Sequence, residues 1–159
     1  MTPAAAREIA LAAHGAQMYG SDPYHVHLDA VAGIVREFGL GEELECAAYL
    51  HDTLEDTPVT AAELTEVGVT EGVLGAVEAV TGRGPNRKAR NADAYAKLAA
   101  YPLAINLKLC DRLANGRAAL ATAPDKLAMY RREYPAFRAT LYPHGGSLEL
   151  WVELDALFA

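Results

Sequence analysis

The chain has 159 residues, enough for one domain with a substantial hydrophobic core. Hydrophobic residues make up 52% of it and charged residues 22%, which is ordinary for a globular protein. The formal net charge of -7 argues against general binding of nucleic acid, which requires a basic surface. It leaves room for a small phosphate ligand held by a local group of basic residues.

The first residues of the chain and its two cysteines favour a protein that works in a reducing compartment. The first residues, MTPAAAREIALAAHG, contain charges and no long apolar run, unlike a secretory signal. No window approaches the roughly 18 apolar residues of a membrane span. Cys46 and Cys110 lie in apolar helical contexts, which favours buried free thiols. We expect a cytoplasmic protein with one domain over residues 1–159 and no membrane partner. Whether it is a monomer or a homodimer is left open.

The apolar spacing is helical along almost the whole chain, and no periodic strand is present. Pro3 stands in the first turn of the first predicted helix, where proline is tolerated. Thr60 and Glu63 form a capping box before a short helix. Residues 81–91, TGRGPNRKARN, are predicted as a loop, and Pro102 is expected to break a helix. The predicted helices span 3–18, 24–38, 42–51, a short stretch after Thr60, 71–81, 91–99, 104–121, 124–140 and 148–158. This pattern predicts an all-α bundle of about eight to nine helices.

Four side chains able to bind a metal or a proton gather in the stretch AAYLHDTLEDTPVT. His51 and Asp52 are adjacent, and Glu55 and Asp56 follow one helical turn later. If the helix continues through this stretch, all four project to one side, because residues four apart share a helix face. Three carboxylates that close repel one another unless a positive charge lies among them. A divalent ion such as Mn²⁺, Fe²⁺, Co²⁺ or Zn²⁺ accepts imidazole and carboxylate ligands and would meet that need.

Two ligands do not close a metal site, so other segments must contribute. DPYHVHLDAVA offers His25 and His27 at the start of the second helix, and INLKLCDRLANGR offers Asp111 within an apolar stretch. A buried aspartate needs a partner, which a metal supplies. Simpler explanations remain for each residue. The histidines could flank a helix start, and Asp111 could pair with Arg112 or Lys108.

The ordered set H…HD…ED…D resembles the HD-domain metal-dependent phosphohydrolases. More narrowly, it is similar to the hydrolase domain of RelA/SpoT-type proteins and to the stand-alone small alarmone hydrolases. The matching stretches are AAHGAQMYGSDPYHVHLDAVAGIVREFG, AAYLHDTLEDTPVTAAEL and LKLCDRLANGRAAL, which cover roughly residues 9 to 120. The resemblance implies the HD-domain fold, Mn²⁺ as the cofactor, and hydrolysis of the 3′-pyrophosphate of guanosine tetra- or pentaphosphate.

The resemblance also implies roles for individual residues. The histidine that closes the family's Tyr-x-x-His motif is His27, the tyrosine being Tyr24. Glu55 and Asp56 match the acidic pair next to the metal, placed to orient a water and take its proton. Asn115, one turn after Asp111, matches a residue that lines the nucleotide pocket. The implied metal ligands are His27, His51, Asp52 and Asp111.

A strongly anionic substrate requires positive charge at its site, and this protein is acidic overall. The predicted loop GRGPNRKARN contains Arg83, Arg87, Lys88 and Arg90, and Lys108 precedes Asp111 by one turn. Arg87, Lys88, Arg90 and Lys108 are therefore candidate phosphate contacts. The loop could equally be an ordinary solvated basic segment.

One part of the family pattern is missing. RelA/SpoT-type hydrolases usually carry an Arg-Lys pair before the Tyr-x-x-His motif, where it packs on the guanine base. This chain reads QMYGSDP there, with Met18 and Tyr19, and Ala118 stands where the family tends to have a polar residue. Tyr19 could stack on a base but would not read guanine in the same way. The substrate therefore stays open between a guanosine or adenosine alarmone and another nucleotide or phosphoester. A non-catalytic module that senses nucleotides is a further alternative.

Overall fold

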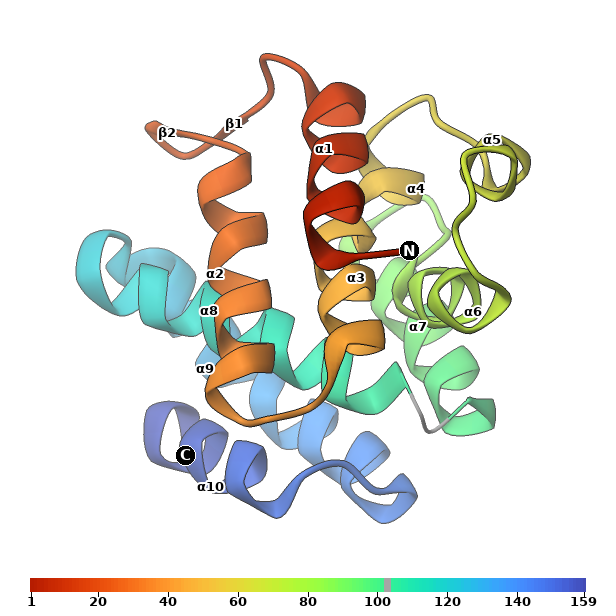
Figure 1. Ribbon diagram of the computed structural model, residues 1–159. Helices are drawn as coiled ribbons and strands as arrows, with labels where there is room; N and C mark the ends of the chain where they lie inside the picture. The colour runs from red at the N-terminus through yellow and green to blue at the C-terminus, as the bar shows by residue number, and fades with distance from the viewer. Residues whose placement is uncertain (102–103) are drawn as a thin grey trace.

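The computed structural model describes residues 1–101 and 104–159, so the predicted break at Pro102 lies outside the described residues (Figure 1). The prediction of an all-α fold is confirmed, since only one short hairpin interrupts the helices of the described part. The strands are β1 (Met18–Tyr19) and β2 (Asp22–Pro23). The helices are α1 (Pro3–His14), α2 (His25–Glu37), α3 (Glu42–Leu50), α4 (Thr53–Asp56), α5 (Ala61–Glu66), α6 (Glu71–Val80), α7 (Arg87–Ala100), α8 (Ile105–Thr122), α9 (Pro124–Leu141), the 3₁₀ turn η2 (Tyr142–His144) and α10 (Leu148–Phe158). Every helix in the described ranges is too short or too polar to cross a membrane.

Helix α8 lies at the centre of the bundle. It contacts α2, α3, α6, α9 and α10, and α1, α2 and α3 stand side by side on one side of it (Figure 1). Its buried residues fall on all sides of the helix, which is the pattern of a helix enclosed by others. Leu107, Leu109 and Leu113 of α8 are fully buried, and so are Phe137 of α9 and Trp151 of α10. The polar Asp111 and Arg112 on this same enclosed helix are the exceptions, and both need partners.

The first predicted helix is too long by about one turn, and a hairpin follows it. Helix α1 ends at His14 because Gly15 turns the chain at a φ of 53°. The chain then forms an antiparallel hairpin in which Tyr19 pairs with Asp22. Strands of two residues are too short to produce a periodic pattern, so the sequence did not reveal them.

The second half of the segment predicted as a basic loop is the start of a helix. Helix α7 begins at Arg87 rather than Asn91, because the Asn86 side chain accepts a hydrogen bond from the Ala89 N–H and caps the helix. Arg87, Lys88 and Arg90 therefore project from a helix in directions that its backbone determines. The capping box at Thr60 and Glu63, by contrast, forms as the sequence indicated.

The helix that carries His51 does not continue through Glu55 and Asp56. Helix α3 ends at Leu50, His51 is its C-cap, and Asp52 is the N-cap of the separate helix α4. Asp52 has φ -96° and ψ -3°, which departs from helical geometry and redirects the chain. The four polar side chains therefore do not form one continuous helical face. His51 and Asp52 face the interior, while Glu55 reaches toward α6 and α7.

Candidate functional site

Four side chains from α2, the α3–α4 junction and α8 come together, and three of them, His27, His51 and Asp111, bring one donor atom each within 4.8 Å of one another. His27 Nε2 lies 3.3 Å from His51 Nε2. Asp52 Oδ2 lies 3.5 Å from His27 Nε2 and 3.0 Å from His51 Nε2. Asp111 Oδ1 approaches the same two nitrogens at 3.4 and 3.6 Å. His27, His51 and Asp111, more than eighty positions apart at the extremes, thus present one nitrogen or oxygen each to a common centre, and Asp52 lies against the two imidazoles.

These distances fit a bound metal ion. Donor atoms bonded at about 2.1 Å to one ion lie about 3.0 Å apart at right angles and about 3.4 Å apart at tetrahedral angles. The observed separations of 3.0 to 3.6 Å span that range. His51 also donates from Nδ1 to the Ala48 carbonyl at 2.7 Å, which leaves its Nε2 lone pair facing the centre. Such an outer hydrogen bond commonly orients a histidine that binds a metal.

Without a metal, protons must balance this cluster. Burial alone would lower the pKa of His51, but the carboxylates of Asp52 and Asp111 outweigh burial and raise it well above its usual value. Burial likewise acts to raise the pKa of Asp52, but His51 and His27 hold it well below its usual value. Carboxylates that stay ionised beside imidazoles form a ready binding site for a divalent cation.

Asp111 has further partners on its own helix. Its Oδ2 pairs with Lys108 Nζ at 2.9 Å, and its Oδ1 accepts from Asn115 Nδ2 at 2.6 Å. The pairing with Lys108 that the sequence left open therefore exists, together with the approach to the histidines. The other suggested partner, Arg112, turns away and binds Glu133 of α9 at 2.8 Å.

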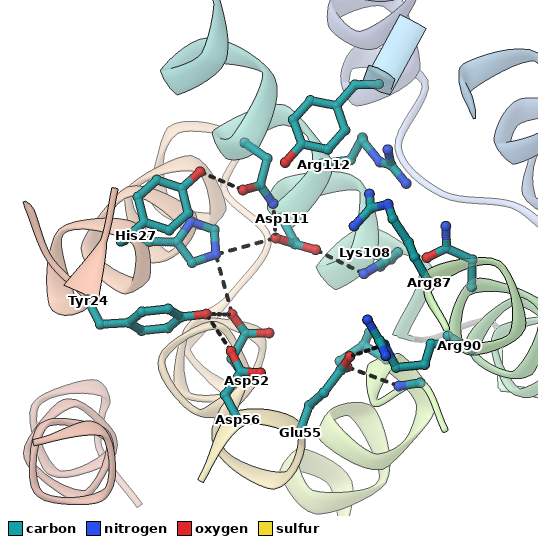
Figure 2. A pocket seen from close by; sticks show the side chains of 17 residues that line it. Tyr24, His27, Asp52, Glu55, Asp56, Arg87, Arg90, Lys108, Asp111 and Arg112 are labelled. Carbon is teal, nitrogen blue, oxygen red and sulfur yellow. Dashed lines mark hydrogen bonds and ion pairs between the residues drawn. The ribbon is translucent and has the colours of Figure 1, made fainter. Parts of the chain in front are cut away.

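Tyr24 connects Asp52, at the His/Asp cluster, to Asp56 of α4. Its hydroxyl lies 2.6 Å from Asp52 Oδ2 and 2.9 Å from Asp56 Oδ2 (Figure 2). A tyrosine hydroxyl has one proton, so the two carboxylates share it. Burial and the charge of Asp52 raise the pKa of Tyr24, which keeps the hydroxyl protonated as a donor. The imidazole of His14 stacks on the ring of Tyr24, with ring centroids 4.4 Å apart.

Glu55 stands beside the cluster without belonging to it. Its Oε2 accepts the Gly82 N–H at 3.1 Å, and its Oε1 lies 3.5 Å from Arg90 Nε. Burial raises the pKa of Glu55 and outweighs the opposing effects of the Gly82 N–H and Lys108. A half-buried carboxyl with a raised pKa is a stronger proton acceptor than an ordinary surface carboxylate.

One polar cavity of about 190 Å³ is lined by Tyr24, His27, Asp52, Glu55, Asp56, Lys108, Asp111 and Asn115. Figure 2 shows Tyr24, His27, Asp52 and Asp56 on one side of it and Arg87 and Arg90 on the opposite side, with Asp111 and Lys108 between them. The cavity therefore has an acidic wall, which can hold a cation, and a basic wall, which can hold an anion. Arg87 is fixed by a two-pronged pair with Glu133 at 2.7 and 3.0 Å.

Other sequence candidates lie outside this cavity. Lys88 lines a separate hollow between α7 and α9. His25 and Arg83 are not among the lining residues of the polar cavity. His14 is buried behind Tyr24 and also contacts Gln17 at 2.8 Å. The candidates that the fold does bring to the cavity wall are Tyr19, Tyr24, His27, Asp52, Glu55, Asp56, Arg87, Arg90, Lys108, Asp111 and Asn115, with His51 buried directly behind.

Sequence reasoning missed three polar residues of the cavity wall, namely Asn91, Arg112 and Tyr130. Asn91 could have been predicted from a helix that begins at Arg87. Residues four apart share a helix face, so Asn91 lies on the same face as Arg87. Arg112 had a weaker signal, as a second charge beside Asp111 within an apolar helix. No pattern indicated Tyr130, which reaches the cavity only through the packing of α9 against α8.

Comparison with known proteins agrees with this geometry. The HD domain family profile matches residues 5–137. The guanosine-3′,5′-bis(diphosphate) 3′-pyrophosphohydrolase of Aquifex aeolicus is 42% identical over 116 residues, which is 69% of this chain and 16% of that protein. The bifunctional (p)ppGpp synthase/hydrolase SpoT of Escherichia coli K12 is 31% identical over 157 residues, 94% of this chain and 22% of that protein. The chain thus spans about a fifth of the length of these relatives.

A solved structure shares the fold. It is a metazoan ortholog of SpoT described as hydrolysing ppGpp, and it matches with a TM-score of 0.77 over 98% of this chain and 93% of its own. At 21% identity this likeness shows the architecture alone. The family profile, however, covers most of the chain, and its matched range includes His27, His51, Asp52 and Asp111. The chain belongs to the HD-domain family.

Proposed function

We propose that this protein is a Mn²⁺-dependent phosphohydrolase that removes the 3′-pyrophosphate from a guanosine or adenosine tetra- or pentaphosphate. The observation that carries the proposal is the pairing of two opposite walls in one cavity. A His/Asp cluster that fits a divalent cation faces arginines and a lysine that fit phosphate, and a carboxyl with a raised pKa stands between them. The relatives named for this hydrolysis add support, because they are 42% and 31% identical to this chain over 116 and 157 residues.

The metal would be held by His27, His51, Asp52 and Asp111. When bound, a divalent ion makes hydroxide available near neutral pH and screens the charge of a phosphate. Two imidazoles and two carboxylates suit several ions, and Mn²⁺ is proposed from the likeness to RelA/SpoT-type hydrolases.

Glu55 is the proposed base for the attacking water. Its carboxylate is oriented by the Gly82 N–H and by Arg90, and its raised pKa brings it closer to neutral pH. Asp56 is the proposed partner that helps to orient the water. The Tyr24 hydroxyl holds the Asp56 carboxylate in place. After attack, the same Glu55 carboxyl can return its proton to the leaving oxygen.

The basic wall would bind the pyrophosphate. Arg90 presents its planar group from the first turn of α7, and guanidinium binds phosphate oxygens in pairs. Arg87, whose Nε and Nη2 are held by Glu133, would add positive charge beside it. Lys108 lies deeper and nearer to the metal cluster, where Asp111 outweighs burial and raises its pKa, so it stays charged. Buried Arg112 adds positive charge behind this wall.

A second hollow of about 450 Å³ adjoins the polar cavity, and Tyr19 and His27 line both. Alanine methyl groups of α8, including Ala114 and Ala118, form much of its wall. A flat, weakly polar group such as a nucleobase fits such a surface, which favours a nucleotide over inorganic pyrophosphate as the substrate. The family's Arg-Lys pair, which packs on guanine, is missing from this sequence. Both guanine and adenine are therefore candidate bases of the substrate.

The proposal is tested by incubating metal-free protein, with and without added Mn²⁺, with guanosine and adenosine 3′,5′-bis(diphosphates), ordinary nucleoside triphosphates and inorganic pyrophosphate. We expect pyrophosphate release from at least one bis(diphosphate), only when Mn²⁺ is present. Preference between the two purines identifies the base. Turnover of triphosphates with neither alarmone hydrolysed would refute the proposal. Binding of alarmones without turnover would instead identify a sensing module.

A further inference from the structure

Tyr19 contacts one member of the metal cluster directly. The β1–β2 hairpin places its ring flat on the imidazole of His27, with centroids 4.7 Å apart and an angle of 7° between the planes. A stacked ring limits the rotation of an imidazole, so Tyr19 restricts where His27 Nε2 can point.

Tyr19 also reaches a second member of the cluster through Asn115. The Tyr19 hydroxyl donates to Asn115 Oδ1 at 2.6 Å, and Asn115 Nδ2 donates to Asp111 Oδ1 at 2.6 Å. This Asp111 oxygen is the one that lies 3.4 Å from His27 Nε2. The chain of hydrogen bonds ties the hairpin to α8, across 96 positions in the sequence.

The direction of these hydrogen bonds is determined by chemistry. An ionised carboxylate only accepts, so the Asn115 amide must turn its NH₂ group toward Asp111. The amide oxygen then faces Tyr19, whose hydroxyl is the donor. Loss of that hydroxyl would leave the Asn115 oxygen without this partner and weaken the reason for the amide to keep its orientation.

We propose that Tyr19 is a positioning residue for the metal ligands His27 and Asp111, acting by stacking on the first and through Asn115 on the second. The inference rests on the proposed metal site. It differs from the expectation that Tyr19 serves as a stacking platform for a base, because His27 already covers one face of the ring. Lys126 Nζ lies 5.6 Å from the ring centroid as well.

The test measures binding of Mn²⁺ alone to metal-free protein by calorimetry, with Tyr19→Phe as the variant. This change keeps the stacked ring and removes only the hydroxyl. We expect an affinity about 10-fold weaker, at the lower end of the range for losing an outer partner of a ligand. Tyr142→Phe is the matched control, because Tyr142 lies in η2 and is not among the residues that line the cavity, so this variant should bind as the wild type does.

A double-mutant cycle separates the relay from a general effect on folding. Asn115→Ala should also weaken Mn²⁺ binding, and adding Tyr19→Phe to it should cause no further loss, because the relay is already broken. With Co²⁺ in the site, the visible absorption spectrum should change in Tyr19→Phe, which reports on ligand geometry directly. The melting temperature of the metal-free variant should match that of the wild type.

Unchanged metal affinity in Tyr19→Phe would overturn the relay to Asp111, and unchanged affinity in Tyr19→Ala as well would overturn the stacking on His27. A higher KM at unchanged metal affinity would overturn both, since that would identify a substrate contact. Losses that add in the double variant would overturn the relay. If the wild-type protein bound no divalent metal, the proposed function itself would fall, a result distinguishable before any variant is compared.

Discussion

Replacing Glu55 by Gln gives the sharpest test of the proposed chemistry, because the change removes a base and little else. Gln keeps the shape of the side chain, and its amide oxygen can still accept the Gly82 N–H now bound at 3.1 Å. Glu55 does not belong to the His/Asp cluster. We therefore expect unchanged Mn²⁺ affinity and a melting temperature close to that of the wild type.

The expected loss is in kcat. General base catalysis by a positioned side chain contributes about 10²- to 10⁴-fold, and each tenfold is about 1.36 kcal/mol of barrier. Glu55→Gln should thus raise the barrier by about 2.7 to 5.4 kcal/mol. Glu78→Gln is the matched control, since Glu78 lies exposed on α6 and away from the cavity.

The pH profile gives an independent readout of the same group. The base acts only when deprotonated, and burial raises the pKa of Glu55 above its ordinary value of 4.5. The wild-type rate should therefore fall on the acid side at a pH above 4.5, and this limb should be lost in Glu55→Gln because Gln does not titrate. Rates are measured by pyrophosphate release at saturating Mn²⁺. A variant with wild-type kcat, or one whose defect disappears on adding more metal, would refute the assigned role.

Three further predictions concern the metal, the substrate and the fold. Asp111→Asn should weaken Mn²⁺ binding by more than the roughly 10- to 100-fold that loss of an outer partner causes, because a ligand itself is changed; calorimetry on metal-free protein checks this, and unaltered affinity would contradict the ligand assignment. Arg90→Gln should raise KM about 10- to 100-fold through loss of a charge-assisted hydrogen bond to phosphate, and an effect confined to kcat would argue against that contact. Gly116→Ala should lower the free energy of unfolding by about 1 to 3 kcal/mol, because the added Cβ would collide with Phe158 of α10. Denaturant unfolding measures that loss, and metal affinity should stay the same since Gly116 lies outside the cavity.

Helical periodicity, caps and the order of the polar motifs were readable from the sequence because each depends on residues close together in the chain. The all-α prediction rested on apolar spacing, and the capping box at Thr60 rested on two residues three apart. His51, Asp52 and Asp111 stood out as polar residues in apolar surroundings, and the resemblance to the HD-domain phosphohydrolases selected His27 over His25. Where a local signal was weak, the prediction was wrong. The cap at Asn86 was overlooked, so Arg87 and Arg90 were assigned to a loop.

The tertiary structure alone decided how those residues meet. Only the packing of α2, the α3–α4 junction and α8 brings side-chain nitrogen and oxygen atoms of His27, His51, Asp52 and Asp111 within 3.0 to 3.6 Å of their neighbours. Only the break at Asp52 separates the inward-facing doublet from Glu55, and only the fold sets Arg90 against that carboxyl. The same is true of Tyr19, whose hydroxyl partner is 96 positions away. Local patterns specify which residues are polar and on which helix. Distances between helices depend on side-chain packing throughout the core, which no short stretch of sequence contains.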